Sequence, residues 1–452
     1  MTDSTPNVCI IGAGPAGLAA ARNLTLRNIQ YTQFERHTGV GGIWDIDNPG
    51  TPMYNSAHFI SSRSMAGYYG FPMPDHYPDY PGQRLILEYT NNFTDAYDLR
   101  RKITFSMGVK DVAKAGDGWK VTTENGQSQN FTHVICTSGH TWKPNMPTYA
   151  GEFTGETMHS VDYREASLFE GKRVLVVGAG NSACDIACDA AQSADAAFIS
   201  MRRGYHFVPK HIFGVPADVF GARSHWMPFK VRRFFFERIL KTLNGDLTQL
   251  GLQAPDHRVL ASHPIINSQL IHYLQHGDVS ACPDIARLDG KVVEFKDGRR
   301  EEIDLIVFAT GYDYAIPYVD SELMNWKNGK PHLAYTVFNE RNPSLFAAGF
   351  TEMNGGGYYI FDEMTSLIAD AIEMERDKPE AWKKAWEQVK QPTDFTGPLG
   401  LIGSQRHSDY VDMETFFAAC SALRKKLGWR DVQKSLEAVQ QVAPQVQAMA
   451  AE

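Results

Sequence analysis

The sequence predicts an α/β protein built around two parallel sheets. Two glycine-rich motifs carry this prediction, one beginning at Gly12 and the other at Gly178. Each follows directly on an apolar run, residues 8–11 and 174–177. A buried strand, a tight glycine turn and a helix, in this order, make up the dinucleotide-binding unit of Rossmann-like folds. One such motif is a weak signal, whereas two on one chain indicate two bound dinucleotides.

Each position of the two motifs has a physical role. The leading glycine allows the tight turn, and the second glycine lets the backbone approach a pyrophosphate at the positive end of the helix. A small residue at the end of the motif lets the helix pack closely on its strand. The expected cofactor-binding residues are Gly12, Gly14, Ala16 and Gly17 in the first motif, and Gly178, Gly180, Asn181 and Ser182 in the second.

The residues that follow each motif distinguish the two cofactors. Glu35 ends the next apolar run, roughly 20 positions on, where a carboxylate accepts hydrogen bonds from a ribose and repels a 2′-phosphate. The first site is therefore suited to FAD or NAD. Arg202 and Arg203 stand at the corresponding strand end of the second unit, where two guanidiniums suit the 2′-phosphate of NADPH. Two such cofactors can pass a hydride from a nicotinamide to a flavin.

Composition and charge exclude several function classes. The chain has 452 residues, 43% of them hydrophobic, which is enough for two domains with sizeable cores. Its net charge of -8 and the lack of a long basic run argue against a nucleic-acid partner. No apolar stretch reaches the ~18 residues of a membrane helix, so no membrane is expected. The six cysteines form no Cys-x-x-Cys pair, which indicates no metal site and a reducing, cytoplasmic location.

A long irregular stretch follows the first unit. Residues 39–82 are rich in Gly and Pro, and such a length of irregular chain inside a compact domain is usually functional. Further along, Val109 is expected beside the adenine end of the first cofactor, and Ser138 and Gly139 close the last strand of a β-rich segment. The secondary structure expected here is strand, helix and strand over 7–35, a helix over 85–99 and strands over 103–136.

The second unit opens at Gly171 and is inserted into the first, which makes the first domain discontinuous. The expected domains are residues 1–165, 166–282 and 283–452, of which the first and the last belong together. The elements expected after the second motif are a partly helical aromatic and basic segment over 205–241, a hairpin over 291–308, and helices from about residue 360.

Four motifs resemble those of the flavin-containing monooxygenases, and the resemblance covers nearly the whole chain. The first glycine motif is similar to the family's FAD fingerprint, and Gly41-Gly42-Ile43-Trp44 is similar to its second flavin motif. Residues 153–163 match the signature FxGxxxHxxxY, directly before the second unit, and residues 308–312 resemble the motif FATGY. The resemblance adds four expected cofactor-binding residues, Gly42, Trp44, Thr310 and Gly311.

The resemblance implies the cofactors and the reaction. An NADPH-binding domain is inserted into a discontinuous FAD-binding domain, and the partners are O2 and a small-molecule substrate, with a homodimer left open. NADPH reduces FAD, oxygen adds to give a C4a-hydroperoxyflavin, and a soft nucleophile takes the distal oxygen. Amine nitrogen and sulfide sulfur are the expected nucleophiles. NADP+ stays bound and excludes water.

Three other functions are compatible with parts of the pattern. Baeyer–Villiger monooxygenases, which act on ketones, share the architecture and a near-identical signature. Their signature ends in Trp-Pro, whereas this chain has Tyr163-Arg164, which favours the heteroatom oxygenases. A flavin disulfide reductase would need a cysteine pair in residues 39–47, where there is none, or at short spacing in the nucleotide domain. A nucleotide-binding sensor without turnover is the third alternative.

One stretch departs from the family pattern. The family carries Thr-Asn between its Trp motif and an FP-rich loop, and this Asn supports the oxygenated flavin. Here the chain reads Phe59-Ile60-Ser61-Ser62-Arg63. Either serine is expected to hydrogen-bond in place of the Asn, and Arg63 is the basic residue that the sequence places near the flavin. Ser61, Ser62 and Arg63 are therefore the candidate catalytic residues.

Overall fold

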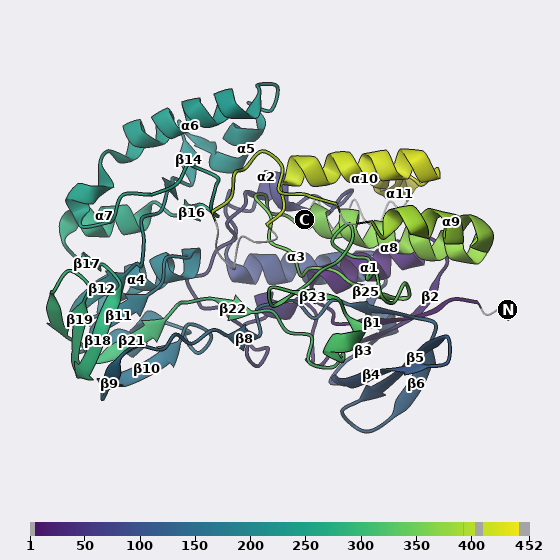
Figure 1. Ribbon diagram of the computed structural model, residues 1–452, viewed down its shortest axis with the longest axis horizontal. Coiled ribbons are helices and arrows are strands. Elements are labelled where there is room, and N and C mark those ends of the chain that lie inside the picture. Colours follow the sequence, from purple (N-terminus) through teal and green to yellow (C-terminus); the bar gives the residue numbers. More distant parts are fainter. Residues whose placement is uncertain (1–4, 392, 403–409, 443–452) are drawn as a thin grey trace.

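Two five-stranded parallel sheets form the centres of two lobes that lie side by side (Figure 1). The computed structural model describes residues 5–391, 393–402 and 410–442. The strand order is β25-β7-β1-β2-β3 in the first sheet and β10-β21-β11-β12-β17 in the second. Each sheet takes strands from segments far apart in the sequence, so the chain crosses between the lobes and returns.

The first sheet confirms the predicted strand, helix and strand of the first unit. Its strands are β1 (Asn7–Ile11), β2 (Gln30–Phe34), β3 (Ile103–Thr104), β7 (His133–Cys136) and β25 (Leu345–Ala347). α1 (Pro15–Thr25) connects β1 to β2 and packs on the sheet with a run of fully buried alanines. The other elements of this region are α2 (Arg63–Ala66), α3 (Gln83–Ala96), β4 (Val109–Ala115), β5 (Gly118–Thr123) and β6 (Ser128–Phe131).

The second sheet repeats this arrangement around the second glycine motif. Its strands are β10 (Glu156–His159), β11 (Arg173–Val177), β12 (Ala196–Ser200), β17 (Val279–Cys282) and β21 (Leu305–Phe308), and α4 (Asn181–Ser193) connects β11 to β12. The segment expected to be partly helical holds α5 (Ala217–Ala222) and α6 (Phe229–Asn244). The short elements nearby are β13 (Phe207–Val208), β14 (His211–Ile212), β15 (Val215–Pro216), β16 (Ile265–Ile266) and α7 (Gln269–His276).

The hairpin expected over 291–308 is wrong in its second strand. β19 (Val292–Phe295) pairs antiparallel with β18 (Ile285–Gly290) and β20 (Arg300–Glu302), whereas β21 lies between β10 and β11 in the parallel sheet. All four residues of β21 are buried, and such a continuous apolar run is typical of a central parallel strand rather than a hairpin arm.

The strand pairing also shows that the inserted domain is larger than expected. Segments on both sides of residues 166–282 belong to the second lobe. β10 precedes residue 166 and β21 follows residue 282, yet both belong to the second sheet. β9 (Gly151–Phe153) pairs with β18 in the same lobe. We therefore propose that the inserted unit extends from β9 to β21. The two crossings between the lobes pair with each other as β8 (Lys143–Pro144) and β22 (Tyr312–Asp313).

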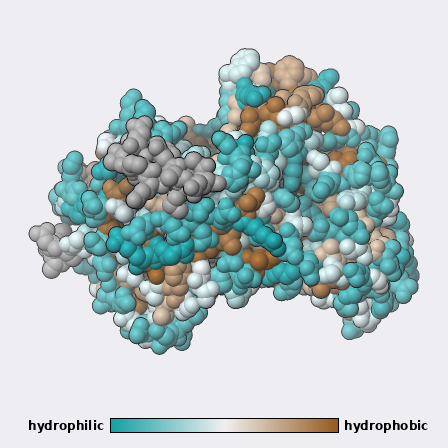
Figure 2. Space-filling view, turned by 180° about the vertical axis from the view of Figure 1, so that it is seen from behind, coloured by the Kyte–Doolittle hydropathy of each residue, from teal (hydrophilic) through white to brown (hydrophobic). Residues whose placement is uncertain are grey.

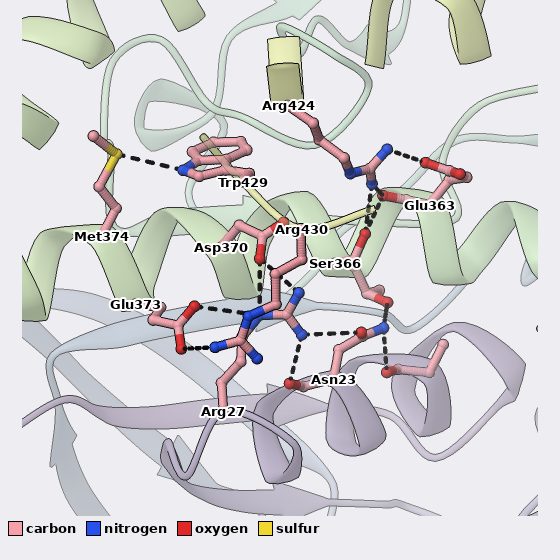
Figure 3. A network of polar contacts seen from close by, with 12 residues as sticks. Asn23, Arg27, Glu363, Ser366, Asp370, Glu373, Met374, Arg424, Trp429 and Arg430 are labelled. Carbon is pink, nitrogen blue, oxygen red and sulfur yellow. Dashed lines mark hydrogen bonds and ion pairs between the residues drawn. The ribbon is translucent and has the colours of Figure 1, made fainter. Parts of the chain in front are cut away.

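Helices follow from residue 359 onward, as expected. They are α8 (Tyr359–Asp377), α9 (Pro379–Val389), α10 (Met413–Leu427) and α11 (Val432–Val442), and the short pair β23 (Trp326–Lys327) and β24 (Lys330–Pro331) precedes them. Buried ion pairs bind α8 to its neighbours, as Figure 3 shows for Arg27–Asp370 and Arg424–Glu363. Arg22–Asp362 is a further such pair between α1 and α8. These contacts fix α1 against the C-terminal helices.

The surface and the remaining side chains add four observations. None of the described helices has the length and apolar character that a membrane span requires. The described residues contain no cluster of three or more side chains suited to holding a metal ion. All six cysteines are buried and free. Figure 2 shows that exposed apolar residues gather at the end of the molecule formed by α5 and α6, among them Trp226, Phe234 and Phe235.

The pair Arg27–Asp370 provides a test of this packing. Arg27 donates to Asp370 Oδ1 from Nε at 2.9 Å and from Nη2 at 2.6 Å. Arg27→Ala leaves a buried carboxylate without its partner and should lower the free energy of unfolding by about 3–5 kcal/mol. The double change Arg27→Met with Asp370→Leu should recover most of the loss, because it removes both charges.

Thermal or urea unfolding measures these changes. The exposed pair Arg300–Asp289 is the control, and Arg300→Ala should cost no more than about 1 kcal/mol. Equal losses for Arg27→Ala and Arg300→Ala would contradict the role given to the buried pair.

Candidate active site

The two glycine motifs meet the same steric constraint, one in each lobe. Gly12 has φ +109°, and a Cβ atom there would lie 2.8 Å from the carbonyl oxygen of Thr137. Gly178 has φ +143°, and its Cβ would lie 2.3 Å from the carbonyl oxygen of Ala309. In both lobes the chain that leaves the neighbouring strand, β7 or β21, presses on the turn. Only glycine satisfies both the backbone conformation and the available space.

The remaining glycines of the first motif form a cradle with the second flavin motif. A Cβ on Gly17 would lie 2.1 Å from the Gly12 carbonyl oxygen, so this glycine allows the close packing of α1. A Cβ on Gly14 would lie 3.4 Å from Gly42 Cα, which places the two motifs backbone to backbone. α1 begins at Pro15 without a side-chain cap, so Ala16 lies at a helix terminus suited to an anion.

Glu35 lies beside this cradle with both carboxylate oxygens engaged. Oε2 accepts a hydrogen bond from the Ala13 N–H at 2.6 Å, and Oε1 accepts one from the His37 N–H at 2.8 Å. Burial raises the pKa of Glu35, and these two hydrogen bonds act in the opposite direction. Each oxygen retains a second lone pair, which is the requirement for accepting a ribose hydroxyl.

The loop after the cradle offers a further polar group. Asn48 is buried and donates from Nδ2 to the Gly42 carbonyl at 2.9 Å, while its Oδ1 has no partner among the described residues. Trp44 is buried and packs edge to face on Phe59 at 5.2 Å between ring centroids. The glycine cradle, the ribose acceptor and this unpartnered oxygen fit FAD at the first site.

The other residues expected at the first cofactor lie at the same edge of the sheet. Ser138 Oγ accepts a hydrogen bond from the Tyr318 hydroxyl at 2.8 Å. Gly139 has φ +77°, and a Cβ there would lie 3.4 Å from the Trp142 indole nitrogen. Val109 begins β4 shortly after Met107, whose N–H donates to the Glu35 carbonyl at 2.8 Å.

The second motif leaves an open surface in front of Gly180. A Cβ on Gly180 would meet nothing within 4 Å, in contrast to Gly178. α4 begins at Asn181, whose Oδ1 accepts from the Ile266 N–H at 2.8 Å, and the exposed Ser182 follows it. The helix end is therefore fixed from the side, while the space in front of Gly180 is free to receive a pyrophosphate.

Arg202 and Arg203 follow the end of β12 by two and three residues. Arg202 is exposed and Arg203 is half-buried. Neither guanidinium forms an ion pair or hydrogen bond with any residue that the structure describes. Gly204 fixes the turn behind them, because a Cβ there would lie 2.3 Å from the Ala254 backbone. Two unpaired guanidiniums at this strand end fit the 2′-phosphate of NADPH.

Thr310 and Gly311 lie at the second sheet, beside Gly178. Thr310 donates from its hydroxyl to the Asn145 carbonyl, at 2.5 Å, and the Gly311 carbonyl oxygen lies 3.1 Å from His159 Nε2. Burial lowers the pKa of His159, while the contact with the Gly311 carbonyl acts in the opposite direction. These residues hold the two crossings between the lobes together, and they occupy the place that Ser138 and Gly139 have in the first lobe.

The three candidate catalytic residues lie in different surroundings. Ser61 and Ser62 are buried, and a Cβ on Gly356 would lie 2.4 Å from Ser61 Oγ. Arg63 instead donates from Nη1 to the exposed Asp75 at 2.8 Å. The structure thus brings Ser61 to the glycine loop 355–357 and directs Arg63 to the exposed Asp75.

Several contacts made by α4 and α5 could not be found from the sequence. The Tyr54 hydroxyl donates to Asp185 Oδ2 at 3.0 Å, and the Tyr163 hydroxyl donates to Asp189 Oδ2 at 2.8 Å. Both acceptors are on α4. The Asp218 carboxylate accepts from the Ser62 N–H. No local pattern marks these residues, because their partners are more than 25 positions away.

Comparison with known proteins agrees with this geometry. Residues 5–364 match the family described as flavin-binding monooxygenase-like. The chain is 31% identical to flavin-containing monooxygenase 3 of Canis lupus familiaris, over 93% of this chain and 88% of the relative. It is 29% identical to dimethylaniline monooxygenase [N-oxide-forming] 2 of Mus musculus, with the same coverage of 93% and 88%.

Two solved structures share the fold. The S-allyl-L-cysteine S-oxygenase of Allium sativum superimposes with a TM-score of 0.65 at 19% identity, over 99% of this chain and 95% of the other. Cyclohexanone monooxygenase in an open form superimposes with a TM-score of 0.67 at 19% identity, over 94% of this chain and 98% of the other. The chain belongs to the family of flavin-containing monooxygenases, enzymes that use FAD and NADPH.

Proposed function

We propose that the enzyme transfers one oxygen atom from O2 to a soft nitrogen or sulfur nucleophile, such as an amine or a sulfide. NADPH is the reductant, and bound FAD supplies the activation of oxygen. The observation that carries the choice of substrate class is the direction of the Arg63 side chain. Baeyer–Villiger chemistry needs a cation beside the forming adduct, whereas oxygenation of a heteroatom does not. Arg63 is engaged by Asp75 at the surface.

Each lobe contributes one cofactor site to this reaction. The cradle of Gly12, Gly14, Gly17 and Gly42 holds FAD, with Glu35 accepting from its ribose. The open turn at Gly180 holds the pyrophosphate of NADPH, and Arg202 and Arg203 bind its 2′-phosphate. The contact of Tyr54 with α4 fixes the second site relative to the first, while Tyr163 holds α4 within the inserted unit. A fixed distance between the two sites is what hydride transfer requires.

Ser61 and Ser62 support the reaction on the flavin side. Both hydroxyls are buried in the segment that corresponds to the family's Thr-Asn, and Ser61 is confined by Gly356. A confined hydroxyl can donate a hydrogen bond without first being ordered, which makes it effective at a developing charge. The buried surroundings exclude water that would otherwise release hydrogen peroxide.

Product analysis tests the substrate class. Trimethylamine, a thioether and a cyclic ketone are supplied in parallel, with NADPH and O2, and the products are identified. We expect the N-oxide or the sulfoxide, with lactone formation weak or absent. Lactone formed faster than sulfoxide would contradict the proposal and make Arg63 the residue to test.

The preference for NADPH tests the second site. A charge-assisted contact to phosphate contributes about 1.5–3 kcal/mol to binding. Loss of the contributing arginine should therefore weaken the binding of NADPH by about tenfold or more. Use of NADH should barely change, because NADH lacks the phosphate. Arg202→Ala, Arg203→Ala and the double variant are compared by titration, with Arg300→Ala as a control elsewhere in the same lobe. Equal losses of affinity for NADPH and for NADH in the double variant would refute the role of the two arginines in binding the 2′-phosphate.

A further inference from the structure

A carboxylate from the inserted unit reaches into the segment that carries the two candidate serines. Asp218 lies in the first turn of α5. Its Oδ2 accepts a hydrogen bond from the Ser62 N–H at 2.7 Å, and its Oδ1 accepts one from the Val219 N–H at 2.8 Å. Asp218 and Ser62 are 156 positions apart in the sequence and belong to different lobes. The contact therefore exists only when the two lobes are docked.

The Ser62 N–H depends on this acceptor. Ser62 is fully buried and precedes α2, a helix of four residues that has no side-chain cap. A buried N–H that loses its acceptor costs the full desolvation of that group. The Ser62 main chain would therefore have to move toward another acceptor or toward water if the carboxylate were removed.

Movement of the Ser62 main chain would displace the hydroxyl of Ser62 and that of the preceding residue, Ser61. The Ser62 Oγ lies 3.2 Å from the Ser64 Oγ within the same turn. Gly356 and Gly357 confine the segment on its other side, since a Cβ on Gly357 would lie 3.1 Å from Ala66 Cα. Three parts of the chain thus meet at the serines, and Asp218 is the contribution of the inserted unit.

Neighbouring contacts fix the strap that carries Asp218, residues 210–218. His211 Nε2 lies 3.0 Å from Asp79 Oδ2. The Tyr80 hydroxyl contacts the Lys210 carbonyl and accepts from the Ala217 N–H at 3.2 Å. The Asp79 carbonyl in turn accepts from the Arg63 N–H at 2.8 Å. The strap therefore holds the segment 62–80 at both of its ends.

We propose that Asp218 is a positioning residue for the oxygenation reaction. Its carboxylate holds the Ser62 main chain and thereby fixes the Ser61 and Ser62 hydroxyls when the inserted unit is docked on the first lobe. The inference rests on the proposed function, because it assigns these hydroxyls to the flavin side of the reaction. It adds that the site is incomplete without the inserted unit.

Three variants test this inference. Asp218→Ala removes the acceptor, and Asp218→Asn keeps one acceptor oxygen without the charge. Asp246→Ala is the matched control, because Asp246 also accepts a main-chain N–H, from Thr248 at 3.0 Å, but within the inserted unit. Amide hydrogen exchange of the peptide containing Ser62 is measured on the FAD-loaded enzyme without NADPH or substrate. Anaerobic flavin reduction by NADPH and the hydrogen peroxide formed per NADPH are measured separately.

Asp218→Ala should raise exchange at the Ser62 amide by about tenfold or more, the effect of losing a hydrogen bond to a charged group. It should raise the peroxide yield severalfold and leave the rate of flavin reduction unchanged. Asp218→Asn should lie between the wild type and Asp218→Ala in both exchange and peroxide yield. Asp246→Ala should match the wild type in all three measurements.

Wild-type exchange at Ser62 in Asp218→Ala would overturn the inference. Faster exchange with an unchanged peroxide yield would also overturn it. A loss of flavin reduction in proportion to the peroxide formed would overturn it as well, because it indicates general damage to the enzyme. Failure of the proposed function has a different signature, the absence of N-oxide and sulfoxide from the wild type. The exchange measurement is made without turnover and stands in either case.

Discussion

The close approach of a neighbouring carbonyl to each glycine turn is the constraint on which the rest of the structure depends. Thr137 presses on Gly12 in one lobe and Ala309 presses on Gly178 in the other. In each lobe this carbonyl belongs to the residue directly after a strand, β7 or β21, and the chain then leads into a crossing to the other lobe. The same contact therefore shapes the cofactor turn and fixes where the chain changes lobes. β8 and β22 pair directly after these contacts, which sets the two turns in a defined relation.

The site between the lobes follows from this arrangement. The first lobe supplies the cradle and the serines, its returning segment supplies Gly356, and the inserted unit supplies α4 and Asp218. Tyr54 and Tyr163 hold α4, while Asp218 holds the serine segment. The two proposed sites, for NADPH and for the reaction with oxygen, are thus connected by hydrogen bonds rather than by packing alone. Buried ion pairs from α1 and from the turn after it to α8 keep α1 in place behind them.

The sequence predicted the elements whose signal is local. The glycine motifs, Glu35 and the arginines after β12 are readable because strand, turn and helix follow each other within a few residues. The sequence wrongly predicts β21 as a hairpin arm, because the pairing of β21 with β10 and β11 depends on residues that are distant in sequence. The direction of Arg63 depends on Asp75 in the following loop, and the role of Asp218 depends on a lobe contact. Neither leaves a periodic pattern in the chain.

The central claim is that the two motifs hold two different cofactors, and paired glycine substitutions test it most directly. Gly14→Val introduces a side chain into the cradle beside Gly42, whereas a Cβ on Gly180 meets no protein atom within 4 Å. FAD content and anaerobic reduction by NADPH are measured for Gly14→Val and Gly180→Val. The account predicts that Gly14→Val loses FAD, while Gly180→Val keeps FAD that dithionite reduces but NADPH does not. Full FAD occupancy in Gly14→Val, or loss of FAD in Gly180→Val, would contradict it.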